Sequence, residues 1–370
     1  MLRLENVTKI FSGMEAPAVN DLNLEVKKGD VCVLVGPSGC GKTTTMKMIN
    51  RIHEPTSGTI YVDGQDALKM DPIKLRLDIG YVIQEIGLFP HMTIAENVAT
   101  VPNEKNWPKD KTQEQVTKML KLVGLDPEEH GSRYPSALSG GQRQRVGVAR
   151  AMVSDPPMML MDEPFGAVDP ITRARLQNEF LRIQERIEKT IVFVTHDIDE
   201  AIKMGDTIAV MREGDLIQHS PPDELLSSPK NEFVANLVGR NRSIKRLHLI
   251  RIREILEDVN RTKPAPEDMP LDDIKKQLDE SDIRSVMVVD RDNKLKGVIG
   301  VSDLKRKAGE VAVDYMNEID QSITSDATLN DALSVMLEAG EGYVAVVNED
   351  DVYQGTITLG DLLNVVKEDS

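Results

Sequence analysis

The segment VCVLVGPSGCGKTT, residues 31–44, constrains the fold of this chain more strongly than any other segment. It satisfies the pattern G-x-x-x-x-G-K-[S/T] with Gly36, Gly41, Lys42 and Thr43. An apolar run precedes the pattern and a helix-forming run follows it, which predicts a buried strand, a tight loop and a helix. Backbone N–H groups of such a loop and of the helix N-terminus bind phosphate groups. The segment therefore predicts a site for a nucleoside triphosphate.

The residues of this phosphate loop have distinct expected roles. We expect Lys42 to reach the β- and γ-phosphates of ATP, and the Thr43 hydroxyl to bind Mg²⁺. The predicted ATP-binding residues of the loop are Gly36, Pro37, Ser38, Gly39, Cys40, Gly41, Lys42, Thr43 and Thr44.

Two apolar strands further along the chain each end in polar residues of catalytic type. The run MMLMDEP (158–164) ends in Asp162 and Glu163, and TIVFVTHD (190–197) delivers His196. Buried carboxylates must be hydrated, paired or metal-bound, and adjacent strand residues point to opposite faces. We expect Asp162 in the Mg²⁺ shell, Glu163 as base for an attacking water, and His196 at the γ-phosphate. The alternative, a helix N-cap pair before the following proline, explains one carboxylate better than both.

A second glycine-rich segment, LSGGQ at residues 138–142, opens a basic, helix-forming run. Ser139 and the N–H groups of Gly140 and Gly141, with Gln142, lie at the expected helix start and predict a second γ-phosphate binder. The LSGGQ segment belongs to a mostly helical block and not to the strand–loop–helix core. We therefore expect it to close on the nucleotide held by a second copy of the chain. The prediction is a homodimer that encloses two ATP molecules.

Strands alternate with helices before residue 240, which predicts an α/β fold: a P-loop NTPase core with a mostly parallel sheet. A helical subdomain of about residues 88–150 is inserted into this core. Later in the chain, residues 271–304 and 329–362 align without a gap at an offset of 58. Each copy reads as helix, strand, turn, strand and helix, which predicts a duplicated α+β module.

Charge supports a boundary near residue 240. The net charge is −16, of which residues 1–239 contribute −7, 240–263 contribute +5 and 264–370 contribute −14. We expect a domain at 1–239, a basic linker helix at 240–263, and a tandem module at 264–370. The two halves of the tandem module are expected at about 264–312 and 313–370.

The same composition limits the partners and the compartment. Strong acidity argues against nucleic acid as the main partner. No apolar run approaches the roughly 20 residues that a membrane-spanning helix requires, and the N-terminus lacks a signal peptide. Cys32 and Cys40 are expected to be reduced thiols. We therefore expect a cytosolic protein that reaches the membrane only through a partner.

Residues 1 to about 240 resemble the nucleotide-binding subunit of ATP-binding cassette (ABC) transporters. Six ordered motifs carry the resemblance: GPSGCGKTT, Gln84 within YVIQEIGLFPHMTIAENV, LSGGQ, LMDEP, GAVD ending at Asp169, and VTHD. The resemblance implies a head-to-tail dimer across which Asp169 communicates. It also implies that Gln84 senses Mg²⁺ and the attacking water, and that the LFPHM segment touches a membrane subunit. Phe11 matches the aromatic residue that stacks on adenine.

Longer stretches, such as MDEPFGAVDPITRARLQNEF, are similar to importers of glycine betaine, carnitine, choline and proline. The duplicated module resembles a tandem pair of CBS domains, which that importer branch often carries. The resemblance implies a separate membrane permease, an extracytoplasmic solute-binding protein, and a peripheral position at the cytoplasmic face of the membrane. An adenine nucleotide or cyclic dinucleotide is a candidate ligand of the CBS pair. Thr358 and Asp361 fit the CBS pattern, but Gly300 replaces the usual threonine in the first copy.

Other functions compete with this interpretation. One is an importer ATPase for a different small solute, such as an amino acid. Another is a soluble cassette ATPase outside transport, which usually has two cassettes or a long coiled-coil insertion. A regulatory module with a decayed ATPase would have lost Lys42, Glu163 or His196, and all three are present. Segment 240–263 mixes Leu and Ile with Arg and Lys, which predicts either a solvated linker helix or an amphipathic helix that contacts anionic lipid or the acidic CBS pair.

Overall fold

The computed structural model describes residues 1–83, 87–166, 170–187, 189–239, 241–259, 263–280, 285–306, 310–319 and 321–367. The chain divides into two compact units, Met1–Gly239 and Arg240–Ser370. Gln84 and Asp169 lie outside the described residues. Within the part that is described, no helix combines the length and apolar character needed to cross a membrane.

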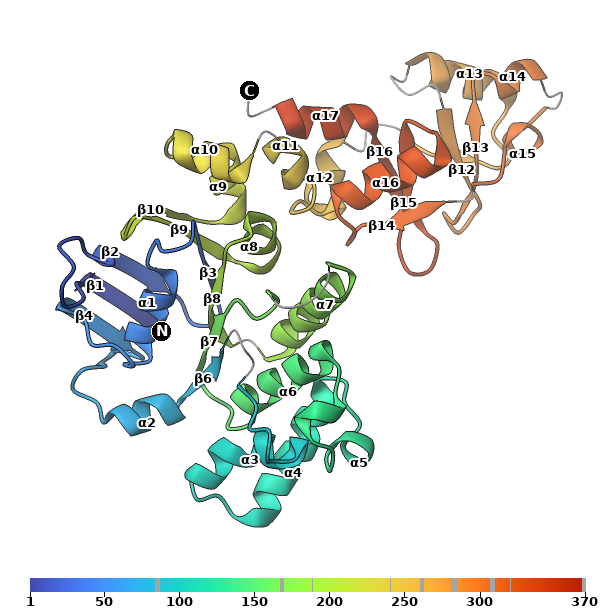
Figure 1. The fold of residues 1–370 in the computed structure, drawn as a ribbon. Coiled ribbons are helices and arrows are strands. Elements are labelled where there is room, and N and C mark those ends of the chain that lie inside the picture. The colour runs from blue at the N-terminus through green and yellow to red at the C-terminus, as the bar shows by residue number, and fades with distance from the viewer. Residues whose placement is uncertain are drawn as a thin grey trace. The chain divides into compact units, whose positions relative to one another are not determined.

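A six-stranded sheet forms the centre of the first unit (Figure 1). The strand order is β10-β9-β3-β8-β7-β6; every pair from β9 to β6 is parallel, and β10 is antiparallel at the edge. All residues of β3, β7 and β8 are buried, as expected of parallel strands covered on both faces. The strands are β3 (Val31–Val35), β6 (Ile79–Val82), β7 (Met158–Asp162), β8 (Thr190–Thr195), β9 (Thr207–Arg212) and β10 (Asp215–Ser220).

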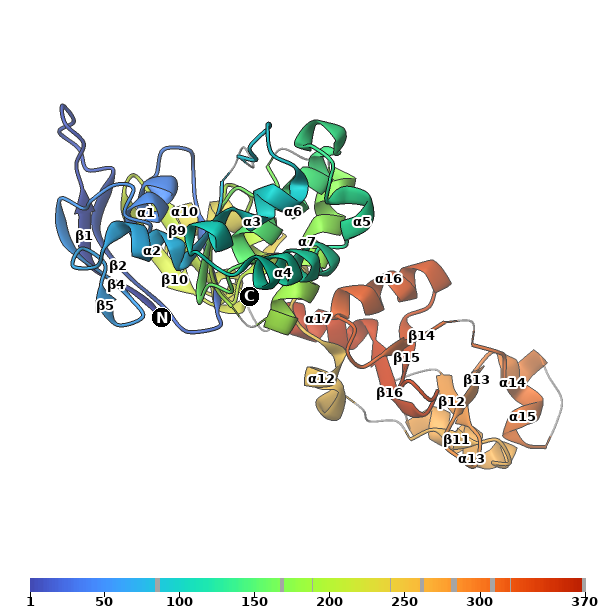
Figure 2. The ribbon, with the colours of Figure 1, turned by 90° about the horizontal axis from the view of Figure 1, so that it is seen from below.

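Different helices lie on the two sides of this sheet. Alternate residues of β3, Cys32 and Leu34, share a hydrophobic core with α1 (Lys42–Ile49). On the other side lie α6 (Gly140–Met152) and α7 (Pro170–Ile187) (Figures 1 and 2). Because α1 follows β3 through the phosphate loop, this loop lies at the carboxyl ends of the parallel strands.

A four-stranded antiparallel sheet of order β2-β1-β4-β5 completes the core on the α1 side. Burial alternates along β2, where Leu22, Leu24 and Val26 face the core. The strands are β1 (Leu2–Lys9), β2 (Val19–Val26), β4 (Ser57–Val62) and β5 (Gln65–Asp66).

The regular elements between β6 and β7 are all helices in the described residues, and one buried amide organises the start of this block. Asn97 is fully buried in α3; its Oδ1 accepts a hydrogen bond from the Phe89 N–H at 2.8 Å. Its Nδ2 donates to the carbonyl oxygens of Phe89 and Met92, both at 3.1 Å. Asn97 therefore fixes the LFPHM segment (88–92) against α3. The helices of this block are α3 (Ile94–Glu104), α4 (Lys109–Leu122), α5 (Pro127–His130), the 3₁₀ helix η1 (Pro135–Ala137) and α6.

Four further helices of the first unit lie in the described residues. They are α2 (Pro72–Leu77), α8 (Ile198–Met204), α9 (Pro222–Ser227) and α10 (Glu232–Val238).

The second unit contains two copies of a three-stranded sheet. In each copy the first two strands pair in parallel and the last two pair antiparallel. Sequence reasoning missed the short first strand of each copy. The first copy contains β11 (Ala265–Pro266), α13 (Leu271–Glu280), β12 (Ser285–Val289), β13 (Leu295–Gly300) and α14 (Asp303–Arg306). The second contains β14 (Ser322–Thr324), α16 (Leu329–Ala339), β15 (Tyr343–Val347), β16 (Tyr353–Thr358) and α17 (Leu359–Lys367).

The prediction of a single linker helix at 240–263 is wrong. The described residues form two short helices, α11 (Arg242–Arg246) and α12 (Ile252–Val259), separated by a turn. Leu247 and Ile252 are buried in the hydrophobic core of the second sheet copy. These apolar residues, which suggested an amphipathic surface helix, instead complete a core that the repeat cannot bury alone.

The core of the first sheet copy is also completed by a short helix from outside the copy. Helix α15 (Ala312–Tyr315) follows the first copy, and Ala312 and Tyr315 are buried in the core of that copy. A boundary between residues 312 and 313 therefore cuts through this helix. Strand residues of both copies also share one cluster, formed by Met287, Val289, Ala345 and Tyr353. The two repeats are packed as one unit.

Candidate ATPase site

The phosphate loop connects β3 to α1 and has the tight geometry that its glycines permit. A Cβ atom on Gly36 would lie 2.1 Å from the Met211 carbonyl oxygen, so only glycine fits there. The Lys42 ammonium folds back over the loop and donates to the carbonyl oxygens of Gly36 at 2.6 Å and Pro37 at 3.0 Å. The loop is thus wrapped around a buried cation at the N-terminus of α1, an arrangement that suits a polyphosphate.

Thr43 and Asp162 meet where α1 begins and β7 ends. The Thr43 hydroxyl donates to Asp162 Oδ1 at 3.2 Å. Burial raises the pKa of the Asp162 carboxyl, the Thr43 hydrogen bond opposes that shift, and the nearby charge of Glu163 adds to it. A hydroxyl and a carboxylate side by side are oxygen donors of the kind that Mg²⁺ prefers, so the residues present fit this ion.

Glu163 and His196 form a pair at the ends of two neighbouring parallel strands. Glu163 Oε2 lies 3.2 Å from His196 Nδ1, and the Glu163 N–H donates to the Val194 carbonyl oxygen at 2.9 Å. Glu163 has a left-handed backbone with φ of 44°, a strained conformation that is concentrated at functional sites. This turn directs the Glu163 carboxylate to His196, while Asp162 faces Thr43. The two adjacent carboxylates therefore have different partners.

The LSGGQ segment forms the capped N-terminus of α6. Ser139 Oγ accepts from the Gln142 N–H at 3.2 Å, and Gln142 Oε1 accepts from the Ser139 N–H at 2.9 Å. Gln142 Nε2 also lies 3.4 Å from His130 Nε2. These contacts all lie inside the helical block. Helix α6, which the LSGGQ segment begins, and helix α1, which the phosphate loop precedes, lie on opposite sides of the sheet (Figures 1 and 2).

Phe11, the residue predicted to stack on adenine, lies two residues after the end of β1. Its ring packs edge-on against His53 with a centroid distance of 5.3 Å, and Lys9 Nζ lies 5.2 Å from the ring centroid. Lys9 in turn donates to the Glu54 carbonyl oxygen at 2.6 Å. These contacts fix the position of the Phe11 ring.

Sequence reasoning missed a buried polar group next to His196. Glu200 accepts hydrogen bonds from the Thr195 hydroxyl and from Gln177 Nε2, the latter at 3.0 Å. Its signal in the sequence was a glutamate four residues after the strand-end histidine.

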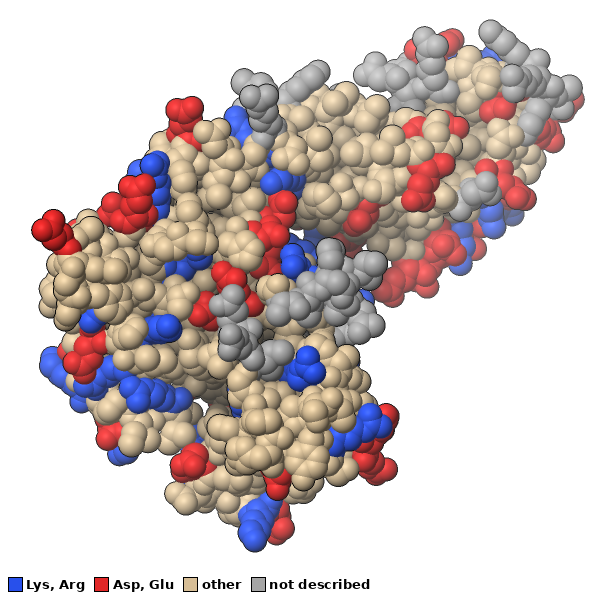
Figure 3. Space-filling view, viewed as in Figure 1, with Lys and Arg blue, Asp and Glu red and all other residues tan. Residues whose placement is uncertain are grey.

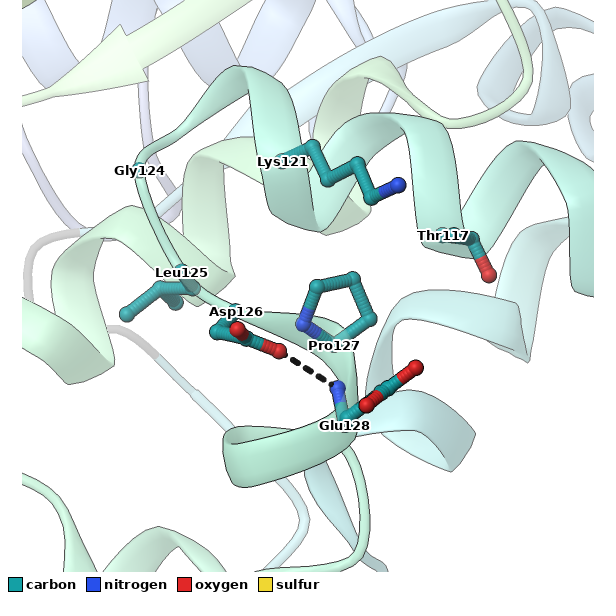
Figure 4. A pocket seen from close by; sticks show the side chains of 7 residues that line it. All are labelled: Thr117, Lys121, Gly124, Leu125, Asp126, Pro127 and Glu128. Carbon is teal, nitrogen blue, oxygen red and sulfur yellow. Dashed lines mark hydrogen bonds between the residues drawn. The ribbon is translucent and has the colours of Figure 1, made fainter.

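Two other surface features do not involve the predicted ATPase-site residues. A pocket of about 430 Å³ lies between α4 and α5, where Asp126 accepts from the Glu128 N–H at 2.8 Å (Figure 4). None of the predicted site residues lines this pocket. In the second unit, acidic side chains outnumber basic ones on the face that Figure 3 shows, in agreement with the charge of −14 over residues 264–370.

The phosphate loop, the paired carboxylates and the strand-end histidine on a parallel sheet define an ATPase of the ATP-binding cassette class. The family model described as ABC transporter matches residues 19–166, and that described as CBS domain matches residues 256–310 and 311–368. A solved dimeric cassette, MJ0796 in a post-hydrolysis state bound to ADP and Pi, superposes with a TM-score of 0.54 at 33% identity. The match covers 60% of this chain and 99% of that one.

Full-length relatives define the family more narrowly. The chain is 45% identical over 369 residues to the glycine betaine/carnitine/choline transport ATP-binding protein OpuCA of Bacillus subtilis, covering 99% of this chain and 96% of that protein. It is 44% identical to the osmoprotectant import ATP-binding protein OsmV of Salmonella typhimurium, covering 97% and 94%. The chain belongs to this family of ABC transport ATP-binding proteins with tandem CBS domains. The comparisons confirm the predicted resemblance, the fold class and an ATPase coupled to transport.

Proposed function

We propose that this chain hydrolyses ATP to power the import of a quaternary-amine osmoprotectant, of the glycine betaine, carnitine, choline or proline type. The solute passes through a separate membrane permease, to which the chain binds at the cytoplasmic face of the membrane. A solute-binding protein on the other side delivers the substrate. The observation that carries the ATPase part is the Glu163–His196 pair beside the Thr43–Asp162 pair. The names of the full-length relatives support an osmoprotectant such as glycine betaine, carnitine or choline.

The residues of the site divide the work of hydrolysis. The loop N–H groups and Lys42 bind the phosphates, and Phe11 stacks on adenine. Thr43 and Asp162 hold Mg²⁺, together with Gln84, and the ion neutralises phosphate charge when bound. Glu163 accepts a proton from the attacking water, which requires that its carboxylate be ionised. His196 orients that carboxylate through the 3.2 Å contact and presents its other ring nitrogen to the γ-phosphate.

We further propose that two copies of the chain complete each site. The LSGGQ segment, with Ser139, Gly140, Gly141 and Gln142, closes on the nucleotide of the partner, and Asp169 links the two sites. The position of α6 supports this proposal, because α6 lies on the far side of the sheet from α1. The N-terminus of a helix binds anions. In the dimer, the anion at the N-terminus of α6 would be a phosphate of the nucleotide held by the partner.

Mixing two defective chains tests the composite site. Heterodimers of Lys42→Ala and Ser139→Arg chains contain one site with both defects and one intact site. We expect ATP-driven association to return above the level of either variant alone. No recovery in verified heterodimers would show that the LSGGQ segment acts within its own chain.

The CBS pair is proposed to regulate the ATPase through ionic contacts. Arg253 Nη1 lies 2.6 Å from Asp326 Oδ1, and Arg251 Nη1 donates to the Asp326 carbonyl oxygen at 2.9 Å. The Arg253 and Asp326 side chains are 59% and 67% exposed, so dissolved salt screens their attraction. These contacts favour the acidic CBS pair over anionic lipid as the partner of these two arginines. An adenine nucleotide or cyclic dinucleotide at Thr358 and Asp361 is a second candidate regulator.

A truncation tests this regulation. ATPase activity is measured across a salt series for the full chain and for a chain ending at Gly239, each with its permease in liposomes of varied anionic lipid. We expect salt to change the activity of the full chain more than that of the truncated chain. Equal salt dependence would show that the CBS pair is not the sensor.

The transport function is tested in the same proteoliposomes. Glycine betaine, carnitine, choline, proline and an unrelated amino acid are screened for stimulation of ATP hydrolysis in the presence of the binding protein. We expect stimulation by one or more of the first four. Stimulation by the amino acid alone would favour the competing importer function.

A further inference from the structure

The buried carboxylate of Glu200 connects two elements that flank the ATPase site. Glu200 lies on α8 and is 7% exposed. It accepts hydrogen bonds from the Thr195 hydroxyl at the end of β8 and, at 3.0 Å, from Gln177 Nε2 on α7. Lys203 Nζ donates to Gln177 Oε1 at 3.3 Å. A buried carboxylate is costly unless it is hydrogen-bonded, and both of its oxygens are.

One end of this network surrounds His196. The Thr195 hydroxyl that donates to Glu200 also accepts from the Asp197 N–H at 3.1 Å. Asp197 Oδ1 accepts from the Glu200 N–H at 3.3 Å and thereby caps α8. The residues on both sides of His196 are thus tied to Glu200. The His196 side chain itself is 59% exposed, so its position depends mainly on this backbone.

The other end of the network reaches the segment that follows Glu163. Gln177 lies on α7, one turn after Arg173. Arg173 Nε donates to the Phe165 carbonyl oxygen at 3.2 Å, and Phe165 is two residues after Glu163. Helix α7 therefore contacts the polypeptide beyond Glu163 through Arg173 and the polypeptide around His196 through Gln177 and Glu200.

We propose that Glu200 is a positioning residue that clasps the His196 turn to α7 and thereby maintains the contact between His196 and Glu163. The inference rests on the ATPase function proposed above. The clasp transmits displacements of α7, whose N-terminus follows directly after Asp169, to His196. Glu200 acts through Thr195 and Gln177 and does not touch the phosphate loop.

The electrostatic setting of Glu200 is consistent with a fixed structural link. Desolvation raises the pKa of the Glu200 carboxyl, and the negative charge of Asp197 adds to this rise. The hydrogen bonds from Thr195 and Gln177 and the positive charge of Arg173 lower it. The group is thus held by directional hydrogen bonds inside a buried site, where loss of one partner leaves another polar atom unpaired.

The test compares variants that break the clasp with one that preserves it. Thr195→Val removes the hydroxyl with little change of shape, and Glu200→Ala removes the carboxylate. Glu200→Gln keeps the size and still offers an acceptor to Gln177 and a donor to Thr195. The control is Glu224→Gln, which alters an exposed glutamate on α9. For each chain, kcat, the ATP KM, and the equilibrium binding of MgATP are measured.

We expect Thr195→Val and Glu200→Ala to lower kcat by about 10- to 100-fold, as small displacements of catalytic groups do, with nearly unchanged ATP binding. Glu200→Gln should recover most of the loss, and Glu224→Gln should match the wild type. In a Glu163→Gln background, Thr195→Val should cause little further loss, because both changes act on the same pair.

Three outcomes would overturn the inference. One is wild-type kcat in folded Glu200→Ala or Thr195→Val chains. Another is a parallel loss of kcat, ATP binding and thermal stability, which indicates a general packing role. The third is a full additional loss from Thr195→Val in the Glu163→Gln background. If Glu200→Ala does not fold, Thr195→Val alone decides. Absence of ATPase activity in the wild-type chain with its permease would instead contradict the proposed function.

Discussion

Replacement of Glu163 by glutamine separates nucleotide binding from hydrolysis. The amide has nearly the same size and can still contact His196 Nδ1 from the position that Glu163 Oε2 holds at 3.2 Å. It has no basic carboxylate, so it cannot accept a proton from water. Lys42 bonds to loop carbonyl oxygens and Thr43 bonds to Asp162, so the phosphate contacts should persist.

The magnitude follows from the role of a general base. Such residues contribute about 10²- to 10⁴-fold in rate, which corresponds to roughly 3–5 kcal/mol of transition-state stabilisation at about 1.36 kcal/mol per tenfold. The expected variant therefore binds ATP with wild-type affinity, turns over at least about 100 times more slowly, and accumulates as an ATP-bound dimer.

Single-turnover ATP hydrolysis and fluorescence-detected nucleotide binding measure the two properties independently. Size-exclusion chromatography with ATP detects the dimer. Glu224→Gln, an exposed change of the same chemistry on α9, serves as control. Turnover of Glu163→Gln within a few-fold of the wild type would refute the assignment of Glu163 as the base. Loss of ATP binding would instead show that Glu163 shapes the phosphate site.

Further predictions concern binding, coupling and pH. Lys42→Ala should weaken ATP binding, measured by nucleotide titration, because it removes a cation from the phosphate loop; unchanged affinity would contradict its role. Asn97→Ala should release the LFPHM segment from α3 and reduce solute-stimulated ATPase in proteoliposomes, while basal ATPase of the isolated chain persists; equal losses of both activities would oppose a coupling role. Because the folded-state pKa of Glu200 is raised, the folded chain binds this proton more tightly than the unfolded chain. Its contribution to the free energy of unfolding should therefore fall as pH rises from the ordinary value of 4.5 to the raised one. Across that pH range, the melting temperature of Glu200→Gln should fall less with rising pH than that of the wild type. Identical slopes of melting temperature against pH would contradict the raised pKa of Glu200.

Much of the first unit was predictable because its motifs combine local geometry with chemistry. The spacing from Gly36 to Thr43 predicts strand, loop and helix together, and the apolar runs before Asp162 and His196 predict buried strands. Alternation predicted that Asp162 and Glu163 point to different sides, but periodicity could not show that Glu163 lies just after the strand with a positive φ. Nor could it show the Glu200 network, which joins residues from three elements.

The second unit shows a different limit of sequence reasoning. The repeat was visible from its matched positions, but the exchange of α12 and α15 between cores was not. Amphipathic spacing in segment 240–263 predicts an apolar face without identifying what covers it. The structure covers Leu247 and Ile252 with the core around Leu329, and it divides the described part of this segment into two short helices.

Uptake of labelled solute measures whether ATP hydrolysis by this chain powers import. Proteoliposomes containing the permease, the binding protein and either the wild-type chain or Glu163→Gln are loaded with MgATP on the side of the ATPase. We expect ATP-dependent accumulation of glycine betaine, carnitine, choline or proline with the wild-type chain, and none with Glu163→Gln. Equal accumulation with both chains, or no accumulation of any of the four solutes with an ATP-hydrolysing wild-type chain, would contradict it.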